Sequence, residues 1–86
     1  MDEQDIITRI RSLYPDAAVD INGADCSFEV YVISEGLLGK STLQRQRSIL
    51  DLFKDELKSG KLHALSIKAR TAAEQAANSG LIQIQP

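Results

Sequence analysis

The stretch that decides the fold is residues 18–33, which read AVDINGADCSFEVYVI. Apolar and polar residues alternate over Ala18–Ile21, and the run from Cys26 to Ile33 is rich in β-branched and aromatic residues, as strands are. The dipeptide Asn22-Gly23 between them is a common hairpin turn. The stretch therefore predicts two antiparallel strands joined at Asn22-Gly23. The second strand should direct three side chains to one face: Phe28, Val30 and Val32.

Apolar residues at helical spacing flank this hairpin on both sides. Before it, the apolar positions of Asp5–Tyr14 share one helical face, and Asp2 is placed to cap the start. After it, apolar residues mark one face of a longer segment, Ser41–Lys58, whose first residue is a good N-cap. Gly60 follows where a left-handed residue commonly ends a helix. Two helices are therefore predicted, one on each side of the hairpin.

A third strand and a short last helix complete the pattern. Leu65, Ile67 and Ala69 alternate with polar residues, and Thr71 with Glu74 forms a capping box for a helix to about residue 78. Because a long helix separates the second strand from the third, a right-handed crossover lets the two lie parallel. We predict a mixed α/β (α+β) fold, α-β-β-α-β-α, with a three-stranded mixed sheet and helices on one face.

Length and composition describe an ordinary small globular domain. The chain has 86 residues, 43% hydrophobic and 26% charged, which favours one domain over residues 1–86. No apolar run approaches the roughly 18 residues that span a bilayer, and the acidic start lacks the basic and apolar regions of a secretory signal. We therefore expect a soluble, cytoplasmic protein without a membrane partner.

Charge is segregated along the chain although the net charge is only −2. Residues 1–35 carry eight acidic and two basic side chains, whereas residues 36–70 carry eight basic and three acidic ones. Such asymmetry is compatible with an anionic partner, or with solvated faces of a dipolar domain.

The few reactive side chains argue against an enzyme. With one histidine and one cysteine, the chain offers no nucleophile, base and orienting group together, and no spacing for a structural zinc site. A Cys26–His63 pair is the one nucleophilic arrangement left open. Any metal would have to be shared with a partner.

A second candidate site is the loop at residues 36–41, which reads GLLGKS. Gly36 and Gly39 match the GxxG pattern of KH domains, in which glycines let a nucleic-acid backbone approach and basic residues neutralise phosphate. Lys40, Arg45 and Arg47 supply such charges. The alternative is a turn that needs positive φ before a helix.

His63 is a candidate metal ligand. It is in phase with Leu65 and Ile67, which predicts a ring on the core side at the start of the third strand. A structural histidine and a metal ligand are both compatible with that position. Cys26, in phase with Phe28, is either a small buried apolar residue or a second ligand.

Several motifs stand out over roughly residues 28–74. They are FEVYVIS at 28–34, GKS at 39–41, RQR at 45–47, EL at 56–57, HALSIKA at 63–69, and Thr71 with Glu74. Together these motifs are similar to the BolA family. The resemblance implies a KH-like α/β fold. It also implies pairing with a monothiol glutaredoxin and glutathione, in a heterodimer that shares a two-iron two-sulfur cluster. A histidine corresponding to His63 would ligate that cluster, and the isolated chain would hold no cofactor.

The same resemblance implies a DNA-binding, transcription-regulating role in the stress response, through the GxxG loop and the basic helix. Three positions depart from the family pattern. Gln46 stands where many members have histidine, Ala24 stands where eukaryotic members have a ligand cysteine, and Gln75 stands where tryptophan is usual. The chain looks most like a bacterial branch linked to acid stress. A shared-cluster accessory protein, a DNA-binding regulator and a plain adaptor are the three functions compatible with the sequence.

Overall fold

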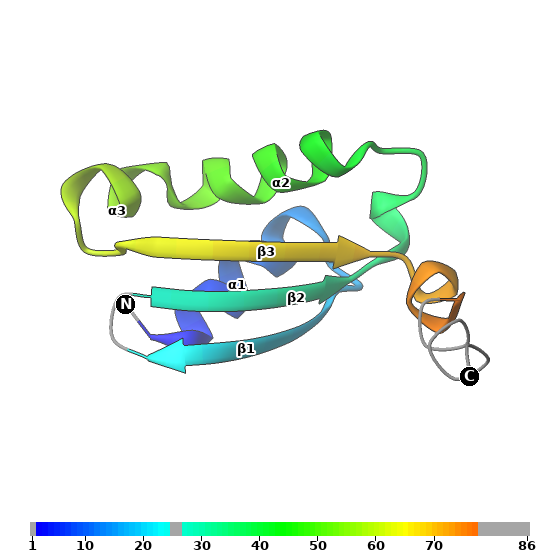
Figure 1. Cartoon of the computed structure of the whole chain (residues 1–86), viewed down its shortest axis with the longest axis horizontal. Helices are drawn as coiled ribbons and strands as arrows, with labels where there is room; N and C mark the ends of the chain where they lie inside the picture. Colours follow the sequence, from blue (N-terminus) through cyan, green and yellow to red (C-terminus); the bar gives the residue numbers. More distant parts are fainter. Residues whose placement is uncertain (1, 25–26, 78–86) are drawn as a thin grey trace, which may run out of the picture.

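The computed structural model describes residues 2–24 and 27–77, and Figure 1 shows their arrangement. In chain order the elements are α1 (Glu3–Leu13), β1 (Ala18–Ala24), β2 (Ser27–Ile33), the 3₁₀ turn η1 (Glu35–Leu37), α2 (Thr42–Leu50), the 3₁₀ turn η2 (Asp51–Phe53), α3 (Lys54–Ser59) and β3 (Ala64–Arg70). A further helical segment covers residues 72–77. None of the helices in the described ranges combines the length and apolar character needed to cross a bilayer.

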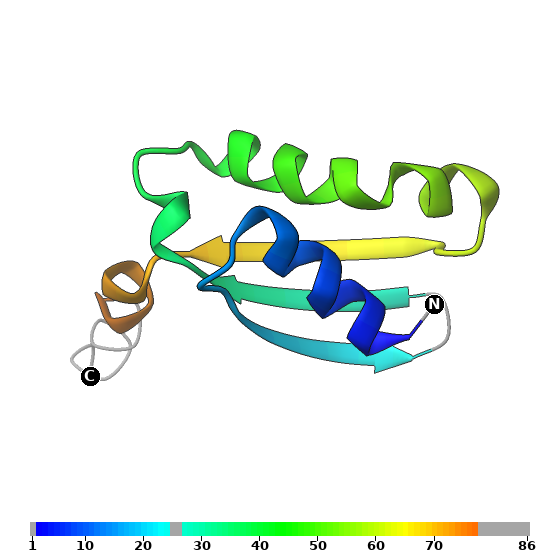
Figure 2. The same cartoon turned by 180° about the vertical axis from the view of Figure 1, so that it is seen from behind.

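The sheet has the predicted mixed topology. Its strand order is β1-β2-β3, with β2 antiparallel to β1 and parallel to β3. Val30 of the central strand pairs with Ile21 on one side and Ile67 on the other. Figure 2 shows α1 across one face of the sheet, with α2 running alongside β3. The opposite face carries no helix among the described residues, as expected for helices on one face.

The core lies between that face and the helices. The second strand behaves as predicted, because Phe28, Val30 and Val32 are all buried. The other core side chains come from α1, its following turn, η1, the α2–α3 region and β3, and they are Ile6, Ile10, Tyr14, Ala17, Leu37, Ile49, Phe53, Leu62 and Ile67. A single apolar layer therefore packs α1, η1, α2 and η2 against the sheet.

The predicted N-caps are confirmed. The Asp2 carboxylate accepts the N–H of Asp5 at 2.9 Å, and helix α1 begins at Glu3, two residues before the predicted start. Ser41 forms a complete capping box with Gln44 at the start of α2. Each cap satisfies backbone donors that a helix start leaves unpaired.

The single long helix predicted over Ser41–Lys58 is wrong in one respect. The 3₁₀ turn η2 interrupts it, and the carbonyl of Leu52 in this turn accepts a hydrogen bond from Arg9 Nη1 at 3.1 Å. In a regular helix the Leu52 carbonyl would accept a backbone N–H of the same helix. Here the Arg9 side chain of α1 donates to it, and the insertion of a side chain in this way is a known cause of breaks in helices. The completely buried Phe53 ends the turn.

The predicted hairpin turn at Asn22-Gly23 is also wrong. Both residues lie within β1, opposite Glu29 and Phe28, and the strand pairing continues beyond them to Ala24, opposite Ser27. Gly23 still supplies the positive φ that the dipeptide signals, at 111°. A β-carbon there would lie 2.3 Å from the carbonyl oxygen of Ser27. Glycine is therefore required by a close backbone approach at the end of the strand pair.

Candidate functional site

His63 lies on the turn between α3 and β3, one residue before the strand begins. Its side chain is exposed, whereas Leu62 before it is completely buried. The Leu62 N–H donates to the carbonyl oxygen of Glu56 at 3.0 Å, and Gly60 adopts the predicted left-handed conformation at φ 86°. The turn therefore directs Leu62 into the core and His63 to solvent.

The prediction that His63 faces the core is wrong for this reason. Strand alternation begins only at Ala64, so the parity of Leu65 and Ile67 cannot be extended back through the turn. A β-carbon built on Gly60 would lie 4.0 Å from His63 Nε2, which places that edge of the ring beside the turn's own backbone. The imidazole is thus held near the surface, accessible to another molecule.

Among the described residues, His63 is the candidate ligand at this end of the sheet. Within residues 2–24 and 27–77, no three side chains of the histidine, cysteine, aspartate or glutamate type gather into a possible metal site. Cys26 lies outside the described residues. Ser27, which follows Cys26 in the sequence, pairs with Ala64, which follows His63. An iron–sulfur cluster at this end would need ligands in addition to His63.

An ion pair behind the His63 turn joins α3 to α1. Arg9 donates a hydrogen bond of 2.7 Å to each carboxylate oxygen of Glu56, and its guanidinium lies 5.4 Å from the centre of the Phe53 ring. The hydrogen bonds from Arg9 lower the pKa of Glu56 to about 2. The carboxylate therefore stays charged and paired well into the acid range.

The Gly36–Gly39 loop lies at the opposite end of the parallel strands. A β-carbon on Gly36 would meet the Tyr14 ring at 2.9 Å, and Gly39 has a φ of 81°. The fold therefore accounts for both glycines: Gly36 allows the close approach of the Tyr14 ring, and Gly39 adopts a positive φ. Leu38 in this loop is 70% exposed, and an apolar side chain at this position cannot neutralise a phosphate. The nucleic-acid role of the loop stays a prediction.

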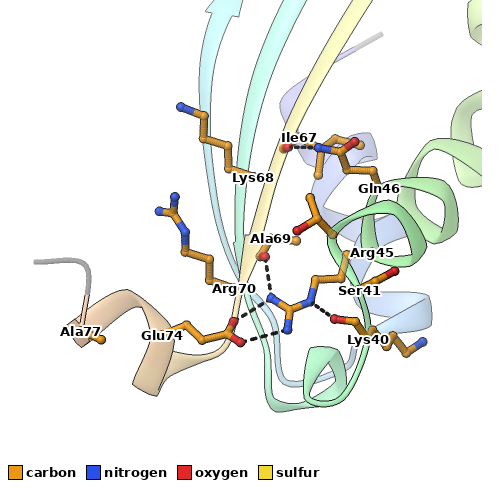
Figure 3. A pocket seen from close by; sticks show the side chains of 11 residues that line it. Lys40, Ser41, Arg45, Gln46, Ile67, Lys68, Ala69, Arg70, Glu74 and Ala77 are labelled. Carbon is orange, nitrogen blue, oxygen red and sulfur yellow. Dashed lines mark hydrogen bonds and ion pairs between the residues drawn. The ribbon is translucent and has the colours of Figure 1, made fainter.

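Arg45 is buried, and Figure 3 shows its guanidinium bonded to Glu74, Ala69 and Lys40. Its guanidinium bonds the Glu74 carboxylate at 2.6 and 3.0 Å, the Ala69 carbonyl at 3.0 Å and the Lys40 carbonyl at 2.9 Å. Four of its five N–H groups are thereby satisfied within the protein. Arg45 serves the fold, so the predicted basic surface is reduced here to Lys40 and Arg47, which are exposed.

A hollow of about 610 Å³ lies beside Arg45 and Glu74, between the start of α2, the edge of β3 and the 72–77 segment. Lys68 and Arg70 line it, and Figure 3 shows them extending together from β3 and away from Arg45. Strand alternation places both side chains on the face opposite the core, which is the sequence signal that points to them. Within the described residues, neither forms a salt bridge.

Glu74, at the end of the sheet opposite His63, resembles Glu56 in being paired with an arginine that lowers its pKa. Hydrogen bonds from Arg45 and from the Thr71 backbone lower its pKa to about 2. The predicted capping box is confirmed, because Thr71 N–H donates to Glu74 Oε1 at 2.9 Å and Glu74 N–H donates to Thr71 Oγ1 at 3.2 Å. An Arg–Glu pair therefore secures each end of the molecule.

These two glutamates predict the acid stability of the fold. Each has a folded-state pKa of about 2 against an ordinary 4.5, so the unfolded chain binds the proton more tightly. Their contribution to stability is complete above about pH 5 and is lost as the pH falls towards 2. Urea unfolding followed by circular dichroism at a series of pH values should show this decline. The Glu56→Gln and Glu74→Gln variants should each show a shallower one, and an unchanged slope in both would contradict it.

Comparison with known proteins identifies the family. The family model "BolA-like protein" matches residues 8–74. SufE-like protein 1 of Arabidopsis thaliana is 55% identical over 47 residues, which cover 55% of this chain and 12% of that protein. Protein BOLA2 of the same plant is 32% identical over 73 residues, covering 85% of this chain and 76% of the relative.

A solved structure agrees with the fold. The BolA domain of SufE1 from Arabidopsis thaliana superposes with a TM-score of 0.73 and 32% identity, covering 86% of this chain and 98% of that domain. The finer resemblance to a bacterial acid-stress branch stays a prediction. The match of residues 8–74, together with the shared mixed sheet, shows that this chain belongs to the BolA-like family.

Proposed function

We propose that this protein is a non-enzymatic accessory protein that pairs with a monothiol glutaredoxin and shares a two-iron two-sulfur cluster with it. The observation that carries the proposal is the placement of His63, an exposed imidazole on a turn anchored by the buried Leu62. His63 is also the chain's single histidine. The proposed setting is cytoplasmic iron–sulfur trafficking during stress.

The chemistry of the site supports a shared cluster. A neutral imidazole is a good iron ligand, and histidine replaces cysteine in some two-iron two-sulfur centres. Since the described part of this chain brings one such donor to the surface, a glutaredoxin cysteine and glutathione would supply the others. The cluster would then depend on both proteins, which suits a role in transfer or sensing.

The test is visible circular dichroism of the full chain mixed with cluster-loaded monothiol glutaredoxin and glutathione. We expect a spectral change with the wild type that His63→Ala loses, because alanine removes the ligand without disturbing the buried Leu62. Arg47→Ala is the matched control, since it also truncates an exposed side chain, and it should behave as wild type. A change that persists in His63→Ala would exclude His63 as a ligand. Cys26→Ser in the same assay decides whether that residue is a second ligand.

DNA-binding regulation is the alternative. The exposed cations Lys40 and Arg47 favour it, and Lys40 lines the same hollow as Lys68 and Arg70. Binding through phosphates weakens with added salt. Titration of a DNA duplex should then show salt-dependent binding that the Lys40→Ala, Arg47→Ala double variant loses. If neither DNA nor the cluster-loaded glutaredoxin produces a signal, the plain adaptor function is left.

A further inference from the structure

The inference begins with the contacts of Arg9, which lies on α1 and is far from His63 in the sequence. Arg9 Nη1 and Nη2 each bond one carboxylate oxygen of Glu56 at 2.7 Å, and Nη1 also bonds the Leu52 carbonyl at 3.1 Å. The two partners lie on either side of Phe53, over whose ring the guanidinium is placed. One side chain of α1 thus fixes both the interruption at η2 and the first turn of α3.

Glu56 connects this contact to the histidine turn. Its side chain is held by Arg9, and its backbone carbonyl accepts the N–H of Leu62 at 3.0 Å. Leu62 is completely buried and immediately precedes His63. A displacement of α3 away from α1 would therefore shift the acceptor that orients the turn.

We propose that Arg9 is a positioning residue for His63: it acts through Glu56 and Leu62 to fix the direction in which the imidazole leaves the turn. The hydrogen bonds of the Arg9 side chain go to Leu52 and Glu56, not to His63. The consequence for cluster ligation rests on the function proposed above, whereas the effect on the turn is a property of the isolated chain. The two can therefore fail separately.

The geometry requires arginine at this position. The planar guanidinium places two parallel N–H groups against the two oxygens of a carboxylate, and a lysine ammonium keeps the charge but not the fork. Arg9 also covers an aromatic ring, which adds packing. Arg9→Lys should consequently restore only part of what Arg9→Gln loses.

The Arg45–Glu74 pair provides a matched control. It is also bidentate and also lowers its glutamate's pKa to about 2, but it lies at the other end of β3. Because Arg45 is more buried than Arg9, breaking its pair should perturb the fold at least as much. A local effect at His63 can thus be separated from a general loss of stability.

The first measurement is amide hydrogen exchange by NMR on the full-length chain, comparing Leu62 with Val30 in the central strand. Arg9→Gln and Glu56→Gln should speed exchange at Leu62 relative to Val30 by about tenfold, and should shift the imidazole signals of the single histidine. Arg9→Lys should lie between these variants and wild type. Glu74→Gln should leave the Leu62 to Val30 ratio unchanged. Equal ratios in Arg9→Gln and Glu74→Gln would overturn the proposal.

The second measurement is the dichroism assay with cluster-loaded monothiol glutaredoxin. Arg9→Gln retains His63 but should lose most of the histidine-dependent signal, Arg9→Lys should recover part of it, and Glu74→Gln should retain it. A full signal in Arg9→Gln would show that the turn needs no support from α1. If His63→Ala has no effect here, the proposed function fails, and the exchange experiment alone decides the positioning role.

Discussion

Replacement of Phe53 by alanine is expected to lower the free energy of unfolding by about 3 to 5 kcal/mol. Phe53 is completely buried and is the largest such side chain in the core. It ends the η2 turn between α2 and α3, belongs to the hydrophobic core, and lies under the Arg9 guanidinium. Alanine would leave a cavity that the surrounding elements cannot fill by moving together.

The measurement is urea denaturation followed by circular dichroism. A domain of this length has a total stability of about 4 to 13 kcal/mol, so the variant should be partly unfolded even without denaturant if the wild type lies near the lower limit. Phe53→Leu is the control, and its cost should stay near 1 to 1.5 kcal/mol because it keeps most of the apolar volume. A loss below 1 kcal/mol in Phe53→Ala would mean that the η2 region is not a packed part of the core.

The second large effect is expected from Leu62→Ala, at about 2 to 5 kcal/mol. Leu62 is completely buried, and its N–H is bonded to Glu56. Truncation removes the apolar side chain that anchors the turn. The core then loses packing contacts, and His63 loses its fixed direction. Stability and cluster sharing should therefore decline together.

The control for Leu62→Ala is Leu65→Ala, two residues into β3. Leu65 is only half-buried and faces the core from a regular strand, so its truncation should cost less and should leave the His63 turn intact. At a temperature where both variants are folded, only Leu62→Ala should reduce the dichroism signal with cluster-loaded glutaredoxin. Equal signals in the two variants would show that the anchor is dispensable for His63.

The regular elements could be predicted from sequence because their signals are local. The alternation of Phe28, Val30 and Val32 repeats every two residues, and a capping box such as Thr71 with Glu74 spans one helical turn. The parallel pairing of β2 with β3 followed from the crossover helix, since few other connections are sterically available.

The site could be predicted only in part, because its geometry depends on long-range contacts. His63 was expected on the core side, but the buried residue is Leu62, whose N–H donates to the Glu56 carbonyl of α3. Arg45 was expected at the surface, yet its partner Glu74 lies 29 positions further along the chain. Periodicity within a segment carries no information about such pairs. Arg9 was overlooked for the same reason, since Glu56 lies 47 positions away.

The parallel pairing of β2 with β3 has a consequence for how many molecules this protein can hold. The His63 turn precedes β3, whereas the Gly36–Gly39 loop follows β2, so the length of the seven-residue strands, roughly 20 Å, separates the two (Figure 1). The two candidate sites therefore share no residue. Cooperativity between ligands bound at the two ends would be measurable as a coupling free energy.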